Sequence, residues 1–248
     1  MNLVLLERGE SDDMGLVRLS GARADHLRHV LKVAPGQLVR VGLLDGPSGV
    51  GTVTSVAGDA VALRCAFDTP PPPPPRVDLL LALPRPKVMR RLWAQLAAIG
   101  VGRIVLTNAA RVERNYFDTH VVTPGCYRPL LIEGLQQARD TRLPDVSVHR
   151  QFKRLVEDSL PRLFPRGLRL VADPAATAPV TPVVRASGDE RVLLAVGPEG
   201  GWNAFETDLL GAHGFQPIGM GPRTLRTDTA CVALLALVHE ALGDDADR

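Results

Sequence analysis

The chain has 248 residues, of which 45% are hydrophobic and 23% are charged, a composition that is ordinary for a soluble globular protein. No apolar run is long enough to cross a bilayer and the N-terminus does not read as a signal peptide, so we expect no membrane association and a cytoplasmic location. The three cysteines are too widely spaced for a zinc cluster or a disulfide framework, and we expect small buried hydrophobic residues at Cys65, Cys126 and Cys231.

The net charge of +2 hides an uneven distribution of charge along the chain. Residues 76–150 carry 12 Lys and Arg against 6 Asp and Glu, a surplus of six, whereas residues 1–75 carry 7 against 8 and residues 151–248 carry 10 against 13. We therefore expect phosphate contacts in the middle of the chain. Arginine supplies most of this charge and suits bidentate phosphate recognition, although codon bias explains most of its excess over lysine.

Residues 1–69 are predicted to form a small β-rich domain. Turn signals separate three strand-like runs, at residues 38–44, 50–56 and 60–67. A helix is expected over residues 25–31, with Leu27, Val30 and Leu31 on its apolar face. His26 and His29 are spaced for a metal but lack a third ligand, so a solvated or RNA-facing surface is the preferred interpretation.

Six consecutive prolines occupy residues 70–75. Because proline fixes φ and donates no hydrogen bond, this segment is predicted to be a polyproline II rod that rises about 3.1 Å per residue. A Pro-rich ligand for a partner domain is one interpretation. A stiff linker between two folded domains, residues 1–69 and residues 76–248, is the preferred one.

Residues 76–248 alternate strand and helix signals. The expected strands cover residues 77–83, 103–107, 146–149, 168–172, 192–196 and 215–220. The expected helices cover residues 86–99, 129–140, 152–160, 203–213 and 228–242. Pro129 is expected to open one helix, and Asn203 with Glu206 to form a capping box on another. Repeated βα units predict an α/β fold with a mostly parallel sheet and helices on both faces.

Two glycine-rich turns are the strongest functional signals in the sequence. Residues 197–201 read Gly-Pro-Glu-Gly-Gly and residues 221–227 read Gly-Pro-Arg-Thr-Leu-Arg-Thr, and each follows a predicted buried strand. Each turn alone is as readily structural as functional. Side by side at consecutive strand ends, they predict a pocket for a small polar molecule that contacts their backbone groups. Phosphate-loop, zinc-hydrolase and serine-esterase motifs do not occur in the sequence.

These turns lie in two strings, residues 196–201 and 219–230, that resemble the signature of the RsmE family. Members of this family belong to the SPOUT superfamily and methylate ribosomal RNA at uridine N3. Residues 25–32, Gly36 and the pair Asp45-Gly46 resemble the family's N-terminal PUA-like RNA-binding barrel. Residues 111–114 and 133–144 resemble its central segments.

The resemblance implies an S-adenosylmethionine-dependent methyltransferase that modifies N3 of a uridine in small-subunit (16S) ribosomal RNA. It also implies a homodimer and a deep trefoil knot near the C-terminus, whose loops hold the cofactor through backbone groups. Two alternatives stay open: a SPOUT methyltransferase for another RNA position, and a non-catalytic RNA-binding relative. Carried onto this chain, the expected cofactor-binding residues are Ala172, Gly197, Pro198, Glu199, Gly200, Gly201, Ile218, Met220, Gly221 and Leu225.

Chemistry on uracil needs a group that stabilises charge on the base, and Arg226 in the second turn is the expected catalytic residue. Asp228, where the family usually has Glu, could accept a proton or cap a helix, and the cap is preferred. No metal ion is expected. The expected RNA-phosphate contacts come from the basic middle of the chain and are Arg85, Lys87, Arg90, Arg91, Arg111 and Arg114.

Overall fold

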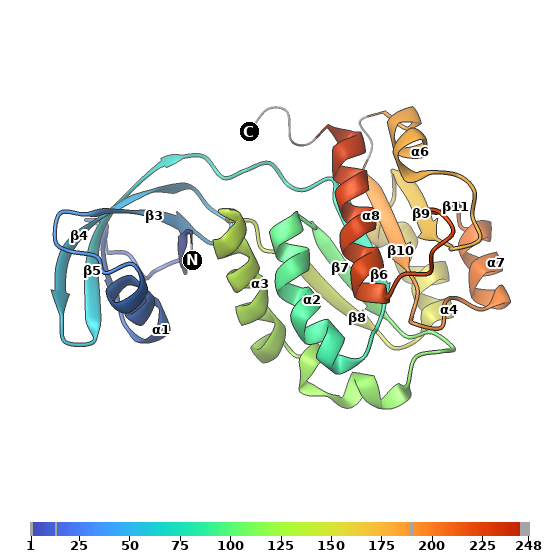
Figure 1. Ribbon diagram of the computed structural model, residues 1–248, viewed down its shortest axis with the longest axis horizontal. Helices are drawn as coiled ribbons and strands as arrows, with labels where there is room; N and C mark the ends of the chain where they lie inside the picture. Colours follow the sequence, from blue (N-terminus) through green and yellow to red (C-terminus); the bar gives the residue numbers. More distant parts are fainter. Residues whose placement is uncertain (1, 13, 189–190, 244–248) are drawn as a thin grey trace. The chain divides into compact units, whose positions relative to one another are not determined.

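The computed structural model describes residues 2–12, 14–188 and 191–243, so residues 244–248 of the expected C-terminal domain lie outside the described part. The chain divides into two compact units (Figure 1). Unit 1 comprises Met1–Pro74 and Leu131–Leu143, and unit 2 comprises Pro75–Leu130 and Pro144–Arg248. Each unit has its own sheet and its own hydrophobic core.

Unit 1 contains a five-stranded sheet, sheet A, in the order β1-β3-β4-β5-β2. Its strands are β1 (Val4–Leu6), β2 (Leu16–Leu19), β3 (Leu38–Leu43), β4 (Ser48–Ala57) and β5 (Ala60–Thr69). Neighbours pair antiparallel except for β1 and β3, which are parallel. The three expected strands are confirmed. The strands β1 and β2 were missed because they have only 3 and 4 residues, too few for a period-2 pattern to stand out.

The expected helix over residues 25–31 was only partly right. The chain forms α1 (Gly21–Asp25) and continues as a π-helical turn, η1 (His26–Val30). Leu27 is buried, but Val30 and Leu31 are 64% and 45% exposed. A π-turn carries more residues per turn than an α-helix, so side chains spaced three and four apart no longer share one face.

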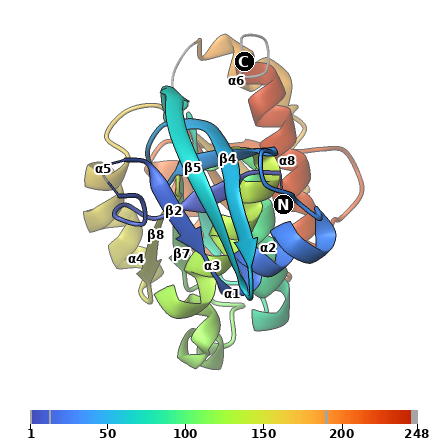
Figure 2. The same ribbon diagram turned by 90° about the vertical axis from the view of Figure 1, so that its left-hand side faces the viewer.

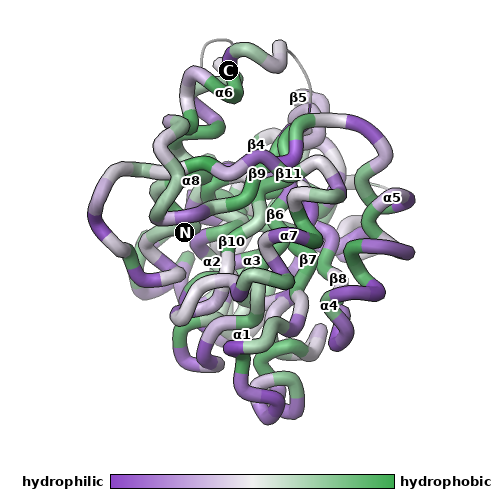
Figure 3. Tube along the Cα trace, turned by 90° about the vertical axis from the view of Figure 1, so that its right-hand side faces the viewer, coloured by the Kyte–Doolittle hydropathy of each residue, from purple (hydrophilic) through white to green (hydrophobic). Residues whose placement is uncertain are grey.

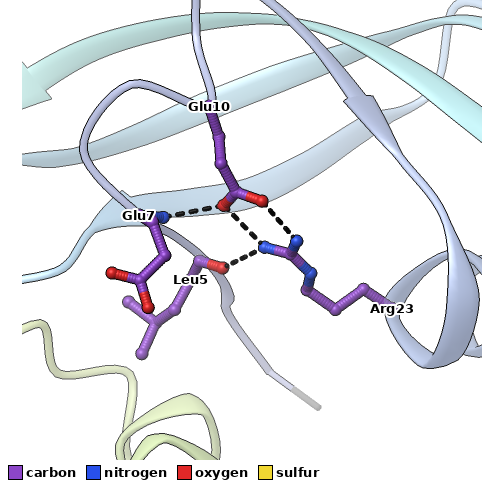
Figure 4. Close-up of polar contacts among 4 residues, drawn as sticks. All are labelled: Leu5, Glu7, Glu10 and Arg23. Carbon is purple, nitrogen blue, oxygen red and sulfur yellow. Dashed lines mark hydrogen bonds and ion pairs between the residues drawn. The ribbon is translucent and has the colours of Figure 1, made fainter.

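Arg23 on α1 connects this helix to the first strand and the loop that follows it (Figure 4). Its Nη1 donates to Glu10 Oε2 at 2.9 Å and to the Leu5 carbonyl oxygen at 3.0 Å. The carboxylate of Glu10 also accepts from the Glu7 amide at 2.7 Å. The pair is about one-third exposed, and it stabilises the packing of α1 on sheet A.

Residues 131–143 join unit 1 through hydrogen bonds between side chains and backbone. Thr141 Oγ1 donates to the Gly46 carbonyl at 2.8 Å, and the Leu143 amide donates to Asp45 Oδ1 at 2.9 Å. The guanidinium of Arg142 donates to the Pro72 carbonyl at 2.8 Å. The proline segment 70–75 forms neither helix nor strand.

Unit 2 is built on a six-stranded sheet, sheet B, in the order β11-β9-β10-β6-β7-β8, and every neighbouring pair is parallel. The α/β fold with a parallel sheet is therefore confirmed. Five pairs of parallel neighbours require crossovers, which the helices supply. The strands are β6 (Val77–Ala82), β7 (Arg103–Thr107), β8 (Asp145–His149), β9 (Leu168–Ala172), β10 (Val192–Val196) and β11 (Phe215–Ile218).

The longer helices of unit 2 follow the expected pattern more closely than the short ones. The helix α2 (Pro86–Ile99) has the expected bounds and ends at Gly100 with φ +91°. The helix α7 (Ala204–Ala212) has the expected capping box of Asn203 and Glu206. The remaining helices are α3 (Pro124–Ala138), α4 (Phe152–Arg154), α5 (Leu160–Leu163), α6 (Val180–Ala186), α8 (Thr227–Leu242), the 3₁₀ turns η2 (Arg114–Asp118) and η3 (His120–Val122), and the π-turn η4 (Leu155–Ser159).

Two of these helices depart from the sequence-based expectation. The expected start of α3 at Pro129 was wrong, because α3 begins at Pro124 and holds Pro129 inside it. Pro124 already occupies the first helical position, where its missing N–H costs nothing. The helix α6 was not expected, because its sequence is rich in β-branched residues that favour strands.

Helices cover both faces of sheet B. On one face α2 and α8 pack together (Figure 1). On the other, Phe152, Leu155, Leu160 and Leu210 pack against strand residues such as Leu193. In Figure 3 the strand segments of unit 2 are coloured mainly as hydrophobic. This burial fixes the ends of the strands, where the two glycine-rich turns begin.

Candidate functional site

A cavity of about 360 Å³ lies in unit 2 at the C-terminal ends of β9 and β10. The carboxyl ends of parallel strands are where ligands bind in open α/β sheets. Its wall combines the end of β9, the turn after β10, the start of α8 and one arginine from the loop after β7. The lining residues are Arg111, Val171, Ala172, Asp173, Pro174, Val196, Gly197, Pro198, Glu199, Gly200, Gly201, Trp202, Thr207, Thr224, Leu225, Thr227 and Ala230.

The two glycine-rich turns were expected side by side at consecutive strand ends, forming one pocket. They follow β10 and β11, which are consecutive in the chain, and both line the cavity, but these two strands are not neighbours in the sheet. Strand β9 lies between β10 and β11 in sheet B. The turns meet across the end of β9, where the Asp173 amide donates to the Ile218 carbonyl at 3.0 Å. Farther on, Thr227 Oγ1 lies 3.4 Å from the Gly197 carbonyl oxygen. The order of the strands along the chain does not give their order in the sheet, because crossover connections can leave an earlier strand between two that are consecutive in sequence.

The turn of residues 197–201 is held by a bond within the turn and by one from the start of α2. The amide of Gly201, whose φ is +73°, donates to the Pro198 carbonyl at 2.8 Å. Oε1 of Glu199 accepts from the amide of Arg85, the N-cap of α2, at 3.3 Å.

Arg111, expected as a phosphate contact, lies against this turn. Its Nη1 donates to the Gly200 carbonyl oxygen. A Cβ placed on Gly200 would lie 2.9 Å from Arg111 Cδ, so only glycine permits this approach without a shift. Arg111 is therefore part of the cavity wall, a role that its position in a basic stretch of the sequence did not indicate.

Glu206 binds the loop that carries Arg111. One carboxylate oxygen accepts from the Ala110 amide at 2.6 Å, and the other accepts from the Asn203 amide at 2.9 Å. Glu206 is buried, at 3% exposure. A single carboxylate thus completes the cap of α7 and fixes the loop that carries Arg111.

Trp202 follows the glycines directly and was missed as a site residue. Its ring stacks on Phe152 with centroids 5.3 Å apart, and it lines the cavity. Within the described part of the chain, its buried Nε1 finds no hydrogen-bond partner. A Cβ on Gly197 would lie 3.1 Å from that nitrogen. Buried donors are normally satisfied, so an unpaired indole N–H at a cavity indicates a place for an acceptor.

The second glycine-rich segment contributes to two cavities. Leu225 lines the first cavity, whereas Met220 and Gly221 line a neighbouring one of about 660 Å³ that also includes Pro174. Ile218 is fully buried at the end of β11. The amide of Gly219 donates to the Ala178 carbonyl at 3.0 Å. The structure thus brings together Ala172, the 197–201 turn and Leu225, and places Ile218, Met220 and Gly221 beside them.

Arg226 is the N-cap residue of α8, and its side chain is exposed. It stands between Leu225 and Thr227, which both line the first cavity. Asp228 was expected to cap this helix, but the N-cap position belongs to Arg226. Asp228 instead lies in the first turn, accepts from the Thr229 amide at 3.0 Å, and pairs with Arg91. Its carboxylate still interacts favourably with the helix N-terminus.

The residues expected to contact RNA phosphates have different surroundings. Arg91 is paired with Asp228, and Arg111 is bound to Gly200. Lys87, Arg90 and Arg114 are exposed and have no ion-pair partner among the residues that the structure describes. Arg85 is also exposed, and a hydrogen bond from it contributes to the environment of the Tyr116 hydroxyl.

Other classes of site find no support in the described residues. Residues 2–12, 14–188 and 191–243 contain no group of three or more His, Cys, Asp and Glu side chains arranged to hold a metal ion. Burial raises the pKa of the Cys65 thiol to about 11 and raises the pKa of the fully buried Cys231 thiol as well. Among the helices described, none has both the length and the apolar character needed to span a bilayer.

Comparison with known proteins agrees with this geometry. A protein with the name ribosomal RNA small subunit methyltransferase E from Treponema pallidum is 29% identical, over 96% of this chain and 90% of its own length. A namesake from Borreliella burgdorferi is 23% identical over 94% of this chain and 95% of its own length. The solved structure of ribosomal RNA small subunit methyltransferase E from Neisseria gonorrhoeae, bound to S-adenosyl methionine, shares the fold. Its TM-score is 0.75 at 21% identity, covering 97% of both chains.

A Legionella pneumophila protein solved with bound cofactor SAM has the same fold, with a TM-score of 0.77 at 23% identity and 97% coverage of both chains. Residues 71–239 match the sequence model of the RNA methyltransferase domain. This match covers more than half of the chain and includes both glycine-rich turns. The chain therefore belongs to the RNA methyltransferase domain family.

Proposed function

We propose that this protein is an S-adenosylmethionine-dependent methyltransferase that methylates N3 of a uridine in small-subunit (16S) ribosomal RNA. The observation that carries the proposal is the cavity formed by the 197–201 turn and the start of α8, with Arg226 at its edge. The names of the relatives from Treponema and Borreliella support the choice of RNA. A SPOUT-type enzyme for another RNA position is the second candidate, since the cavity accounts for the methyl donor and not for the choice of RNA nucleotide.

The cavity fits S-adenosylmethionine. Its volume of about 360 Å³ lies in the range of small-molecule sites. The residues that would hold the donor are Ala172, Gly197, Pro198, Glu199, Gly200, Gly201 and Leu225, joined by Trp202. The unpaired Nε1 of Trp202 supplies a donor for a polar group of the ligand. When bound, the sulfonium supplies an electrophilic methyl group.

The residues of the chain then act on the acceptor. Uridine N3 carries a proton at neutral pH and becomes a nucleophile once that proton leaves. The exposed guanidinium of Arg226 stabilises the negative charge that develops on the uracil oxygens. The donor held by the 197–201 turn would supply the methyl group to N3, and its thioether would be the leaving group. The proton from N3 leaves to solvent.

Further features belong to the same proposal. Unit 1 acts as a PUA-like RNA-binding domain, residues 70–75 act as a linker, and unit 2 carries the methyltransferase. The chain forms a trefoil knot near its C-terminus. Support for the knot comes from the segment after β11, which bridges to Pro179 and then returns toward Gly197. We also propose a homodimer and a cytoplasmic location, where ribosomal RNA is modified.

Two measurements test the proposal. Calorimetry on the full chain should detect saturable binding of S-adenosylmethionine. Mass spectrometry of ribosomal nucleosides from a deletion strain should show loss of N3-methyluridine from small-subunit RNA. Unchanged N3-methyluridine together with loss of another methylated nucleoside would favour the second candidate. Absence of donor binding would leave a non-catalytic RNA-binding protein.

Arg226→Ala gives a point test. This substitution should lower kcat by about 100-fold or more, while donor affinity and thermal stability stay near those of the parent. Arg166→Ala is the matched control, because Arg166 is exposed and precedes the N-terminal end of β9, whereas the cavity lies at the C-terminal end of that strand. Near-normal methyl transfer by Arg226→Ala would refute the role given to this residue.

A further inference from the structure

Sheet A has an outward face that carries positive charge. The nearly neutral total charge of residues 1–75 does not reveal it. Along its strands, Val17, Val41, Val53 and Leu63 point into the core of unit 1. Side chains alternate between the two faces of a sheet, so the residues between them point outward. The outward face is defined by the residues Leu16, Arg18, Leu38, Arg40, Val50, Thr52, Ala62, Arg64 and Ala66.

The strand register places these outward residues in rows across the sheet. One row runs from Leu38 on β3 through Thr52 on β4 and Arg64 on β5 to Leu16 on β2. Strands β2, β4 and β5 are seen together in Figure 2. The row is open to solvent at both ends, because Leu38 is 65% exposed and Leu16 is 41% exposed.

Neighbouring rows add two further arginines. Arg40 pairs with Val50, which pairs with Ala66, and on the other side Arg18 pairs with Ala62. The three arginines of the face thus stand in three successive rows on β3, β5 and β2. With strands about 4.8 Å apart and about 3.4 Å per residue, they form a diagonal of roughly 20 Å across the sheet.

These three guanidiniums are unpaired. Arg18, Arg40 and Arg64 are exposed, and none has a hydrogen-bond or ion-pair partner within residues 2–12, 14–188 and 191–243. Two other arginines of this unit are occupied, Arg23 by Glu10 and Arg28 by Asp25.

Carboxylates are few on the outward face. None of its nine residues is acidic. By the same alternation Asp68, two residues after Ala66, lies at the margin of this face, where it accepts from the Thr69 hydroxyl. Asp12, before β2, accepts from the amides of Met14 and Leu16. Residues 1–75 are close to neutral in total, but folding gathers unpaired positive charge on one face.

One end of this face is covered and the rest is open. A Cβ on Gly42 would lie 2.8 Å from Thr141 Cγ2, so residues 131–143 close the sheet near β1. The nine outward residues include no aromatic side chain, and Phe67 packs against the core instead. Without an aromatic platform for base stacking, the face suits a sugar–phosphate backbone that reads charge and shape.

We propose that the outward face of sheet A binds the phosphate backbone of the substrate RNA through Arg18, Arg40 and Arg64. The aliphatic side chains between them, Leu16, Leu38 and Val50, contact the sugars. This inference rests on the proposed function. It adds a second phosphate-binding surface to the one expected from the middle of the chain.

The test measures the salt dependence of RNA binding. A labelled transcript of small-subunit ribosomal RNA is titrated with the full chain by fluorescence anisotropy at several salt concentrations. The triple variant Arg18→Ala/Arg40→Ala/Arg64→Ala should weaken binding roughly 10- to 100-fold and lower the magnitude of the salt slope by about two to three. The KM for RNA should rise while kcat at saturating RNA and the donor Kd stay unchanged.

Matched variants separate charge from folding. The triple lysine variant keeps the charges and should retain most of the salt slope. Each single alanine variant should lower the slope by about one, so the proposal stays testable if the triple variant does not fold. Arg166→Ala, which removes one exposed guanidinium from unit 2, should leave the slope unchanged.

The outcomes are distinct. Unchanged affinity and slope in the folded triple variant would overturn the inference while leaving the proposed function intact. Failure of the parent chain to bind both RNA and S-adenosylmethionine would instead overturn the proposed function. Loss of binding to phosphatidylglycerol vesicles, with RNA binding retained, would identify the face as a membrane-surface site and also overturn the inference.

Discussion

Nη2 of Arg91 on α2 lies 3.2 Å from Oδ2 of Asp228 in the first turn of α8. The two residues are 137 positions apart in sequence. Arg91 was expected to contact phosphate and Asp228 to cap a helix, yet they form an ion pair on one face of sheet B. The pair fixes the start of α8, whose first residue, Thr227, belongs to the cavity wall.

Because Arg91 is neutralised by Asp228, its removal should have little effect on RNA binding. Arg91→Ala should leave the salt slope of RNA affinity unchanged, whereas Arg90→Ala on the same helix should lower it by about one. A double-mutant cycle with Asp228→Asn should give a coupling of about 0.5 kcal/mol in unfolding free energy, as for other half-exposed pairs. Equal loss of slope in both arginine variants would contradict the pairing.

Arg111 should act on the methyl donor more than on RNA. Arg111→Ala removes the hydrogen bond to the Gly200 carbonyl and should raise the donor Kd by about fivefold, corresponding to about 1 kcal/mol. Calorimetry checks the value. Arg114→Ala, which removes an exposed arginine three residues on, is the control and should leave donor affinity unchanged. Normal donor affinity with a reduced RNA salt slope in Arg111→Ala would return Arg111 to the phosphate contacts.

Gly219→Ala should damage the site through a steric clash. A Cβ at this position would overlap the Ala176 carbonyl oxygen, which belongs to backbone and cannot move alone. We expect a loss of about 1–3 kcal/mol in stability and weaker donor binding. Gly211→Ala in α7 has nothing within 4 Å of the new Cβ and should stabilise the helix by about 0.5–1 kcal/mol. Thermal unfolding distinguishes the two, and equal stabilities would argue against the close approach.

The Glu10–Arg23 pair should make unit 1 sensitive to acid. The hydrogen bond from Arg23 holds the pKa of the Glu10 carboxyl below its ordinary value. The stabilisation is therefore present above the ordinary glutamate pKa and is lost as the pH falls through the lowered folded-state pKa. Glu10→Gln should lower the unfolding temperature at neutral pH, and the difference from the parent should shrink below about pH 4. A difference that is constant with pH would rule out the ion pair as its source.

The sequence alone predicted the parallel α/β sheet, the bounds of α2 and the capping box of Asn203 and Glu206. These features depend on local patterns: apolar runs for buried strands, helical spacing for α2, and a side chain three residues from the amide that it binds. Their physical cause lies within a few neighbouring residues, so a linear reading captures it. The turn at residues 197–201 belongs to the same class, because a cluster of glycine and proline is a local signal, although the need for glycine at position 200 comes from the remote Arg111.

Tertiary structure decided which distant groups meet. The insertion of β9 between β10 and β11, the contact of Arg111 with Gly200 and the pairing of Arg91 with Asp228 all depend on crossovers that join remote segments. The same holds for Arg18, Arg40 and Arg64, whose common face follows from strand register. The net charge of a segment counts all of its charged residues. A binding surface depends only on the charged side chains that remain exposed and unpaired after folding.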